Sequence, residues 1–305
     1  MFPEAVRAVR ELRPEAFIFE NVKGLMREVF ANYFEYVYLQ LTYPILIRRK
    51  LETWVDHRAR LEKHQTANVG AAEYNVVYRL LNAADYGVPQ KRERVFIVGF
   101  RSDLGIEWSF PEGEHSEDSL IRAQWISGEY WDRHDMSRGR RPVSTFRNST
   151  RLQRLRNEEV AAIKKRPWLT VRDAVYDLPD PELHPINKVP NHVFNPGARA
   201  YPGHTGSPLD EPAKTLKAGD HGVPGGENML SRRDGSVRYF TVREAARLQT
   251  FPDDYVFRGS WTETMRQLGN AVPVRLAEIV ARSVKRKLLE SDALLLKKNG
   301  KGNAE

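Results

Sequence analysis

Four short strings of the sequence contain side chains that can hold a ligand or move a proton. The first is the apolar run Phe17–Phe19, which is followed by the carboxylate of Glu20 and then by Asn21 and Val22. In an open α/β sheet, ligands bind beyond the carboxyl ends of the strands, which makes Glu20 a candidate site residue. A carboxylate at the end of an apolar strand is also commonly a surface cap, so this string alone leaves both interpretations open.

The second string, YGVPQKRERVF, carries an amide and two guanidinium groups at Gln90, Arg92 and Arg94. These groups are strong hydrogen-bond donors that could orient a polar ligand. A Gln-x-Arg-x-Arg string is also commonly a solvated edge, and its two arginines could equally pair with Glu93 and Glu20. The string therefore has a functional and a structural interpretation.

The other two strings stand late in the chain and belong to predicted helices. REAARLQTFP begins at Arg243, two residues after Thr241, and Thr241 starts the capping-box sequence TVRE. The helix predicted here ends before Pro252. QLGNAV ends at Val272 and leads into a long helix with apolar residues along one face.

The net charge is +8, from 48 Lys and Arg against 40 Asp and Glu, and the isoelectric point is near 9.6. Between residues 133 and 172 there are twelve Lys and Arg against three Asp and Glu, which makes this basic segment +9 and the rest of the chain about −1. The segment is either a solvated surface or a face that contacts nucleic-acid phosphates. The second interpretation would use Arg138, Arg140, Arg141, Arg147, Arg151, Arg154 and Arg156.

Hydrophobic periodicity predicts an α/β chain with a loop-rich middle, from about residue 105 to residue 238. Helices are expected at residues 3–12, 25–66 with an interruption near Pro44, 170–178, 241–250 and 269–289. Strands are expected at residues 17–19, 74–81 and 95–100. Continuous apolar runs such as 17–19 and 95–100 predict strands of a parallel sheet that are buried on both faces.

The chain contains no cysteine, which excludes disulfides, cysteine-bound metals and a thiol nucleophile within these residues. Its most apolar run, residues 36–47, is shorter than the roughly 20 residues that a membrane-spanning helix needs, and no signal peptide is recognisable. We therefore expect a soluble, cytoplasmic protein with no membrane contact.

In this order and spacing, the four strings resemble the DNA (cytosine-5)-methyltransferases over about residues 1–105 and 237–290. The resemblance implies an α/β fold: a partial Rossmann-like, S-adenosylmethionine-dependent methyltransferase domain with a small irregular target recognition domain. The catalytic domain would comprise 1–105, with an insertion at about 25–70, and 237–290. The target recognition domain would comprise 106–236, and 291–305 would be a disordered tail. The string LDEPAKTL, which ends at Leu216, would mark the return to the shared fold.

The resemblance also implies roles for single residues. Cytosine C5 is unreactive until a nucleophile adds at C6, and Glu20, with a pKa raised by desolvation, would donate a hydrogen bond to ring N3. Arg94 and Arg92 would bind ring O2 and orient the flipped base. The implied substrate-binding residues are Asn21, Val22, Gln90, Arg138, Arg140 and Arg141. The implied cofactor-binding residues are Asn270, Ala271 and Val272, and the implied structural residues are Arg243, Glu244 and Arg247.

In this family the nucleophile is the cysteine of a Pro-Cys-Gln string, and a Phe-x-Gly-x-Gly loop binds the cofactor; both are absent from this sequence. The resemblance therefore implies the carboxyl-terminal portion or subunit of a methyltransferase of double-stranded DNA, from a restriction–modification system, with an incomplete S-adenosylmethionine site. Three explanations stay open. A second polypeptide could supply the missing strings, the chain could be a remnant of an interrupted gene, or it could bind DNA without catalysis. Under all three, the chain alone is expected to be inactive.

Overall fold

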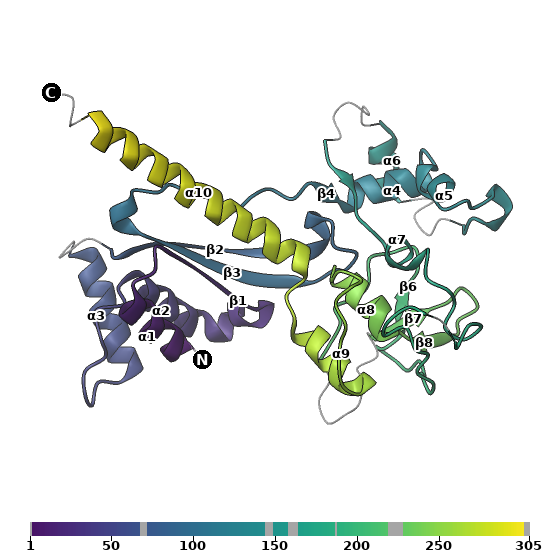
Figure 1. Ribbon diagram of the computed structural model, residues 1–305, viewed down its shortest axis with the longest axis horizontal. Coiled ribbons are helices and arrows are strands. Elements are labelled where there is room, and N and C mark those ends of the chain that lie inside the picture. Colours follow the sequence, from purple (N-terminus) through teal and green to yellow (C-terminus); the bar gives the residue numbers. More distant parts are fainter. Residues whose placement is uncertain are drawn as a thin grey trace. The chain divides into compact units, whose positions relative to one another are not determined.

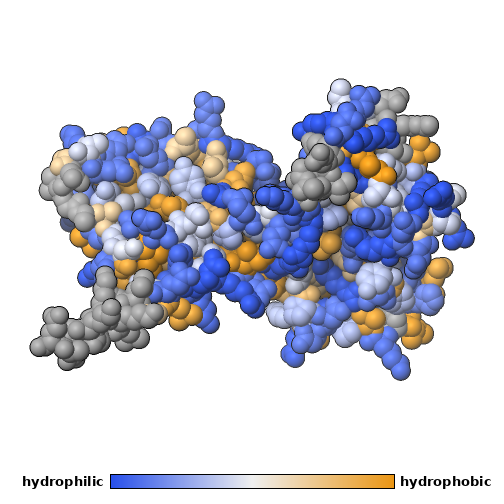
Figure 2. All heavy atoms as spheres, turned by 90° about the horizontal axis from the view of Figure 1, so that it is seen from above, coloured by the Kyte–Doolittle hydropathy of each residue, from blue (hydrophilic) through white to orange (hydrophobic). Residues whose placement is uncertain are grey.

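The computed structural model describes residues 2–67, 72–143, 149–157, 164–186, 188–218 and 228–301. The chain divides into two compact units (Figure 1). The first unit comprises Met1–Leu81, Glu93–Pro111 and Ile279–Glu305, and the second comprises Asn82–Arg92 and Glu112–Glu278. On the face shown in Figure 2, hydrophobic residues form small separate areas among hydrophilic ones, in keeping with a composition that is 29% charged. No helix within the described ranges is long and apolar enough to cross a bilayer.

The first unit combines helices with a three-stranded sheet. Its helices are α1 (Phe2–Leu12), α2 (Ala31–Thr42), α3 (Trp54–Thr66) and most of α10 (Val274–Lys301), with short 3-10 turns η1 (Lys23–Met26), η2 (Glu28–Phe30) and η4 (Ser102–Leu104). Its strands are β1 (Ala16–Val22), β2 (Tyr74–Asn82) and β3 (Glu93–Arg101), in the order β1-β3-β2. The strands predicted at 17–19, 74–81 and 95–100 are confirmed, as is the break between two helices near Pro44.

The direction and burial of β1 differ from the prediction. β1 is antiparallel to β3, with Phe17 opposite Gly99 and Glu20 opposite Phe96, so the predicted parallel pairing is wrong for these two strands. β3 is buried along almost its whole length because it is the central strand of the sheet. β1 is an edge strand in the described part of the sheet, and its Ile18 is 37% exposed. The prediction of burial on both faces therefore holds for β3 and is wrong for β1.

The two faces of this sheet are covered by different helices (Figure 1). α1 and α2 pack Val6, Val9, Phe34, Val37 and Leu41 against Phe17, Val95 and Ile97. Phe100 lies at an even-numbered position of β3, on the opposite face, and its ring centroid lies 5.8 Å from that of Trp108. The Trp108 indole N–H donates to the hydroxyl of Ser283 in α10 at 3.0 Å. Successive side chains of a strand alternate between the faces. Glu20, which is opposite Phe96, therefore lies on the face away from α1 and α2.

The second unit is made of short elements. Its helices and 3-10 turns are η3 (Ala83–Tyr86), α4 (Glu117–Trp125), α5 (Glu129–Arg133), η5 (Arg138–Arg140), α6 (Thr150–Asn157), α7 (Val171–Val175), α8 (Val242–Leu248) and α9 (Trp261–Asn270). One sheet pairs β4 (His115–Ser116) with β5 (Arg166–Pro167), and another joins β6 (Ser207–Pro208), β7 (Met229–Ser231) and β8 (Val237–Tyr239).

The return to the first unit comes later than the predicted residue 237. α8 and α9 share a core with the 209–216 string, formed among others by Ala213, Leu216, Phe240, Ala245 and Leu268. Residues up to Glu278 therefore belong to the second unit, and only α10 from Ile279 onward belongs to the first.

Helix boundaries follow local capping signals. Thr170 and Thr241 each accept a hydrogen bond from the backbone three residues later and form the predicted capping boxes with Asp173 and Glu244. The helix expected over 170–178 is shorter and ends at Val175. The prediction of a disordered tail at 291–305 is wrong for residues 291–301, where α10 continues. The physical reason is composition: SDALLLKK is rich in strong helix formers.

Candidate functional site

Glu20 and Arg94 form an ion pair on one face of the first unit's sheet. The Nε atom of Arg94 lies 2.8 Å from Oε1 of Glu20, and the side chains are 11% and 25% exposed, respectively. Arg94 also donates from Nη1 to the carbonyl of Glu93 at 2.8 Å. Burial lowers the pKa of the Arg94 guanidinium, and the neighbouring Glu20 carboxylate opposes this shift. The pair combines a carboxyl group and a fixed guanidinium in a setting that solvent still reaches.

The residues around this pair have local roles. The Asn21 side chain accepts a hydrogen bond from the backbone N–H of Val22 at 2.8 Å, and Val22 is exposed at the end of β1. Glu93 pairs with Lys23, whose Nζ lies 2.8 Å from Oε2. Of the two arginine–glutamate pairs expected as the structural interpretation, Arg94 with Glu20 is confirmed, whereas Glu93 pairs with Lys23.

Arg92 lies in the second unit and is fully buried. Its guanidinium donates to three backbone carbonyls: Leu216 at 2.9 Å, Gly269 at 2.6 Å and Ala271 at 2.9 Å. The prediction that Arg92 binds a base is therefore wrong, because its terminal donors already hold the chain together. Arg92 joins the second string to the fourth.

Gln90 precedes Arg92 and is also fully buried. The backbone on either side of it is bonded to Ala213, which donates to Pro89 O at 2.9 Å and accepts from Lys91 N at 2.8 Å. Both polar atoms of the Gln90 side chain are buried without a hydrogen-bond partner in the described part of the chain. A buried polar group left in this state costs about 1–3 kcal/mol.

The fourth string forms the end of α9. An added Cβ at Gly269 would lie 2.2 Å from the backbone nitrogen of Ala218, so only glycine allows this approach. The backbone N–H of Ala271 donates to the Gln267 carbonyl at 3.0 Å, and its carbonyl accepts a hydrogen bond from Arg92. Asn270, at the last helical position, is exposed, and Val272 is half-buried. The turn is thus rigid, and the Asn270 side chain is its polar group open to solvent.

The third string belongs to a network of charged side chains, part of which is buried. Glu244 forms a two-point ion pair with Arg238, at 2.6 and 2.7 Å, and both side chains are almost fully buried. Arg243 donates to the carbonyls of Pro190, Pro252 and Tyr255. Arg247 pairs with Asp177 and Asp253, and the Asp253 hydrogen bond contributes most to raising its pKa. These contacts join α8 to the loops around it.

The basic segment has fewer free cations than its composition suggests. Six of its arginines pair with acidic side chains: Arg133, Arg141, Arg151, Arg154, Arg166 and Arg172. Three of the seven arginines that the phosphate-contacting interpretation would use, Arg141, Arg151 and Arg154, are paired in this way. Arg147 lies outside the described residues. Arg138, Arg140 and Arg156 are exposed, and no acidic side chain of the described residues pairs with them.

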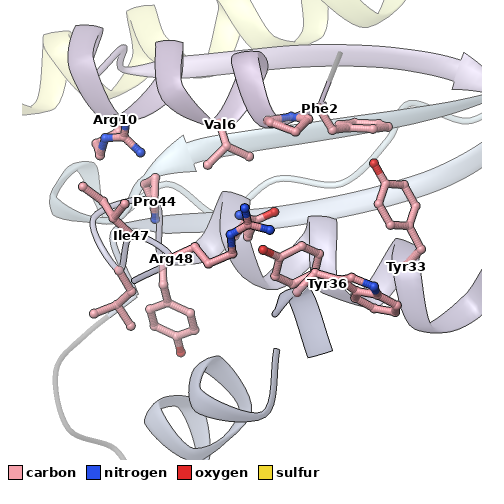
Figure 3. Close-up of a pocket in the computed structure, with 13 residues that line it drawn as sticks. Phe2, Val6, Arg10, Tyr33, Tyr36, Pro44, Ile47 and Arg48 are labelled. Atoms are coloured by element: carbon pink, nitrogen blue, oxygen red, sulfur yellow. The ribbon is translucent and has the colours of Figure 1, made fainter. Parts of the chain in front are cut away.

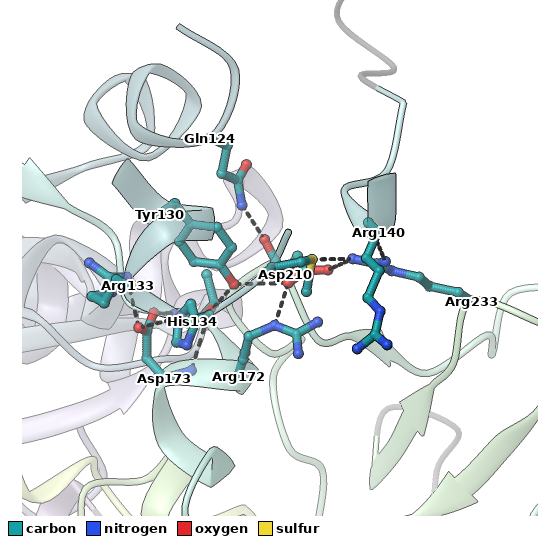
Figure 4. A network of polar contacts seen from close by, with 11 residues as sticks. Gln124, Tyr130, Arg133, His134, Arg140, Arg172, Asp173, Asp210 and Arg233 are labelled. Carbon is teal, nitrogen blue, oxygen red and sulfur yellow. Dashed lines mark hydrogen bonds and ion pairs between the residues drawn. The ribbon is translucent and has the colours of Figure 1, made fainter. Parts of the chain in front are cut away.

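Sequence reasoning missed a second polar network, which is centred on Asp210 (Figure 4). Its carboxylate accepts from Arg172 Nε at 2.7 Å, from the Tyr130 hydroxyl at 3.0 Å and from Arg233 at 3.1 Å. Burial raises the pKa of Asp210, but hydrogen bonds from these partners outweigh it and lower the pKa overall. The available signal was the carboxylate at the start of the 209–216 string.

A cavity of about 380 Å³ lies in the first unit, between α1, α2 and the loop before α3 (Figure 3). Tyr33, Tyr36 and Trp54 line it together with Arg10 and Arg48. None of the residues predicted as site residues lies in its wall. The cavity is therefore separate from the Glu20–Arg94 pair.

The sequence model of the C-5 cytosine-specific DNA methylase family matches residues 1–43 and 55–286. The unmatched residues 44–54 fall within the predicted insertion at 25–70.

Similar curated proteins include the Type II methyltransferases M.SacI of Streptomyces achromogenes and M.NgoPII of Neisseria gonorrhoeae. M.SacI is 30% identical over a match that covers 94% of this chain and 64% of M.SacI. M.NgoPII is 32% identical over a match that covers 94% of this chain and 70% of M.NgoPII. This chain thus spans slightly less than two thirds of M.SacI.

Solved structures that resemble the chain include a prophage-encoded DNA modification methyltransferase (E. coli), with 20% identity and a TM-score of 0.46 over 93% of this chain and 72% of that one. Another is the Dnmt2 methyltransferase of S. pombe, with 16% identity and a TM-score of 0.44 over 92% and 68%. Because the family's sequence model matches most of the chain, this protein belongs to the C-5 cytosine-specific DNA methylase family.

Proposed function

We propose that the chain is the carboxyl-terminal portion of a DNA (cytosine-5)-methyltransferase. The complete enzyme would transfer methyl from S-adenosylmethionine to C5 of a flipped cytosine in double-stranded DNA. The observation that carries the proposal is the match of the family's sequence model to residues 1–43 and 55–286, which include the partly exposed pair of Glu20 and Arg94. We assign the enzyme to a restriction–modification system of the cytoplasm, because similar chains are named Type II methyltransferases.

In this proposal Glu20 and Arg94 stabilise the ring while the reaction proceeds. Addition of a thiolate at C6 moves electron density onto ring N3 and O2, so both atoms need hydrogen-bond donors. A base that enters the site would exclude water from Glu20, which would then hold a proton at N3. Arg94 stays charged and donates to O2, because burial lowers its pKa from a very high starting value. Once C5 carries the new methyl group, loss of the C5 proton to a base in the completed enzyme or to water, and departure of the thiolate from C6, would restore the ring, and the N3 proton would return to Glu20.

S-adenosylmethionine supplies the electrophilic methyl group when it is bound. The residues of the 270–272 turn fit one edge of such a cofactor. The N–H and carbonyl of Ala271 are already bonded to Gln267 and Arg92, which leaves the exposed amide of Asn270 and the side chain of Val272. The proposed cofactor-binding role of this turn is therefore limited to Asn270 and Val272, and the rest of the site would come from other residues.

The nucleophile would also come from residues beyond this chain, which contains no cysteine. We propose that a second polypeptide, which carries the Phe-x-Gly-x-Gly and Pro-Cys-Gln strings, completes the enzyme. The absence of cysteine also supports a second candidate function, a DNA-binding remnant without catalysis.

The test is to purify the chain alone and together with the segment encoded directly upstream of it, and to measure tritium transfer from labelled S-adenosylmethionine to DNA. We expect no transfer by the chain alone and transfer by the combination. Replacement of the partner's cysteine by serine is the control and should abolish transfer. Transfer by the chain alone would overturn the proposal, and DNA binding without transfer by the combination would favour the remnant.

A further inference from the structure

Two exposed arginines stand on a turn whose backbone is tied to the rest of the second unit. The turn is η5, and its side chains Arg138 and Arg140 form no ion pair within the described ranges, unlike most arginines of the basic segment. Figure 4 shows the Arg140 side chain extending away from the Asp210 network while its backbone lies beside Arg233. The two guanidinium groups are therefore free to meet a ligand.

The backbone of this turn is held from both sides. Arg233, in the β7–β8 connection, donates from Nη1 to the Arg140 carbonyl at 2.7 Å and from Nη2 to Asp210 at 3.1 Å. Arg141 donates to the Met136 carbonyl at 3.0 Å and also pairs with Asp132. Asp210, in turn, is held by Arg172 and Tyr130, so Arg233 is anchored on a fixed carboxylate.

This arrangement favours a contact with base edges over a contact with phosphates. A phosphate contact requires positive charge within reach and tolerates a flexible backbone. Two-point recognition of guanine O6 and N7 requires a guanidinium fork in a fixed orientation. The hydrogen bonds from Arg233 and Arg141 fix the backbone that carries the two forks.

We propose that Arg138 and Arg140 are specificity-determining residues that read guanine in the major groove, and that Arg233 is a positioning residue that acts through η5. The inference rests on the proposed function, which supplies double-stranded DNA as the substrate. It predicts a target sequence that contains guanine and assigns its recognition to one turn.

The test uses the full chain and a library of 24-base-pair duplexes with a randomised centre, from which bound duplexes are selected and sequenced. The wild-type chain should enrich guanine at defined positions. Arg138→Ala and Arg140→Ala should each lose the preference for guanine at one position by about 5- to 150-fold, the range of one two-point contact. Affinity for unselected duplexes should change much less.

Arg233→Met should weaken the same preferences although Arg138 and Arg140 are still present, and Arg233→Lys should restore part of them, since it keeps one charged donor. Arg154→Ala is the matched control, because Arg154 is an exposed arginine of the same segment that is already paired with Asp118. Circular dichroism and the thermal midpoint verify that each variant is folded.

The outcomes separate this inference from the proposed function. Uniform weakening on all duplexes in the Arg138→Ala and Arg140→Ala variants, with a salt slope reduced by about 1, would assign the turn to phosphates and overturn the inference alone. Unchanged base preference in all three variants would also overturn it alone. Failure of the wild-type chain to bind any duplex, both alone and combined with the cysteine-bearing segment, would overturn both the inference and the proposed DNA substrate.

Discussion

Arg94 reaches Glu20 diagonally across the antiparallel pair of β1 and β3, with 2.8 Å between Nε and Oε1. Arg94 lies opposite Val22, and Glu20 lies opposite Phe96, so the two side chains point to the same face two residues apart in register. Diagonal neighbours in such a pair lie about 7–8 Å apart at their backbones, a span that a long side chain covers. The pair thus follows from strand register, which brings together two residues that are distant in the sequence.

The first prediction concerns Glu20 in the enzyme completed by a cysteine-bearing segment. Glu20→Gln keeps the shape and a hydrogen-bond donor but cannot relay a proton, so DNA binding should stay nearly normal. The single-turnover rate should fall by about 10²–10⁴-fold, the range typical of general acid–base groups. Arg94→Ala should lower the rate and also weaken retention of the base, because a charge-assisted hydrogen bond contributes about 1.5–3 kcal/mol. A full rate in Glu20→Gln would identify Glu20 as a strand cap.

The second prediction separates Arg92 from Arg94. Arg92→Met leaves three buried carbonyls without their donor, so the free energy of unfolding should fall by about 3 kcal/mol or more. Urea unfolding followed by circular dichroism measures the change. Arg138→Ala is the control for loss of an arginine and should change stability by less than about 0.5 kcal/mol, because Arg138 is exposed. Equal stability of the two variants would contradict the role assigned to Arg92.

The third prediction concerns the close approach at Gly269. Gly269→Ala would place a methyl group 2.2 Å from Ala218 N and 2.4 Å from the Lys217 carbonyl carbon, and backbone atoms cannot yield cheaply. The variant should lose about 1–3 kcal/mol of unfolding free energy, although alanine normally stabilises a helix. Gly139→Ala, with no heavy atom within 4 Å of its added Cβ, is the matched control and should stay near wild type. A thermal midpoint equal to that of the control would show that α9 does not pack as described.

The fourth prediction concerns pH and His57. This buried ring lies 2.9 Å from the Tyr36 hydroxyl and 2.7 Å from the Leu46 carbonyl, and burial lowers its pKa. Because the folded pKa is below the unfolded value of about 6.5, the unfolded state binds more protons below that pH. The contribution of His57 to the free energy of unfolding is therefore complete above about pH 6.5 and is lost as the pH falls toward and through the pKa of the folded state.

Unfolding free energies measured at pH 7.5 and pH 5.5 test this sign. The wild-type chain should lose more stability on acidification than His57→Gln, which cannot titrate. If His57→Gln lost as much unfolding free energy between pH 7.5 and pH 5.5 as the wild-type chain, the prediction would be contradicted.

The sequence by itself determined the local elements and the family. The apolar runs, the Thr-x-x-Asp and Thr-x-x-Glu capping boxes and the order of the four strings depend on neighbours a few residues apart, and these signals are written in the chain. They were sufficient to predict β1, β2 and β3, the start of α7 and α8, and the ion pair of Arg94 with Glu20 as one of two interpretations.

Tertiary structure alone decided how each charge is used. Arg92 and Arg94 look equivalent in the sequence, yet one is enclosed by the carbonyls of Leu216, Gly269 and Ala271 and the other faces a carboxylate. The difference arises because β3 begins between them and because the partners of Arg92 lie more than a hundred residues away. Likewise, the free or paired state of the arginines in the basic segment depends on acids such as Asp118 and Asp210, which only folding brings near. Burial and long-range pairing are properties of the packed chain, and no window of sequence contains them.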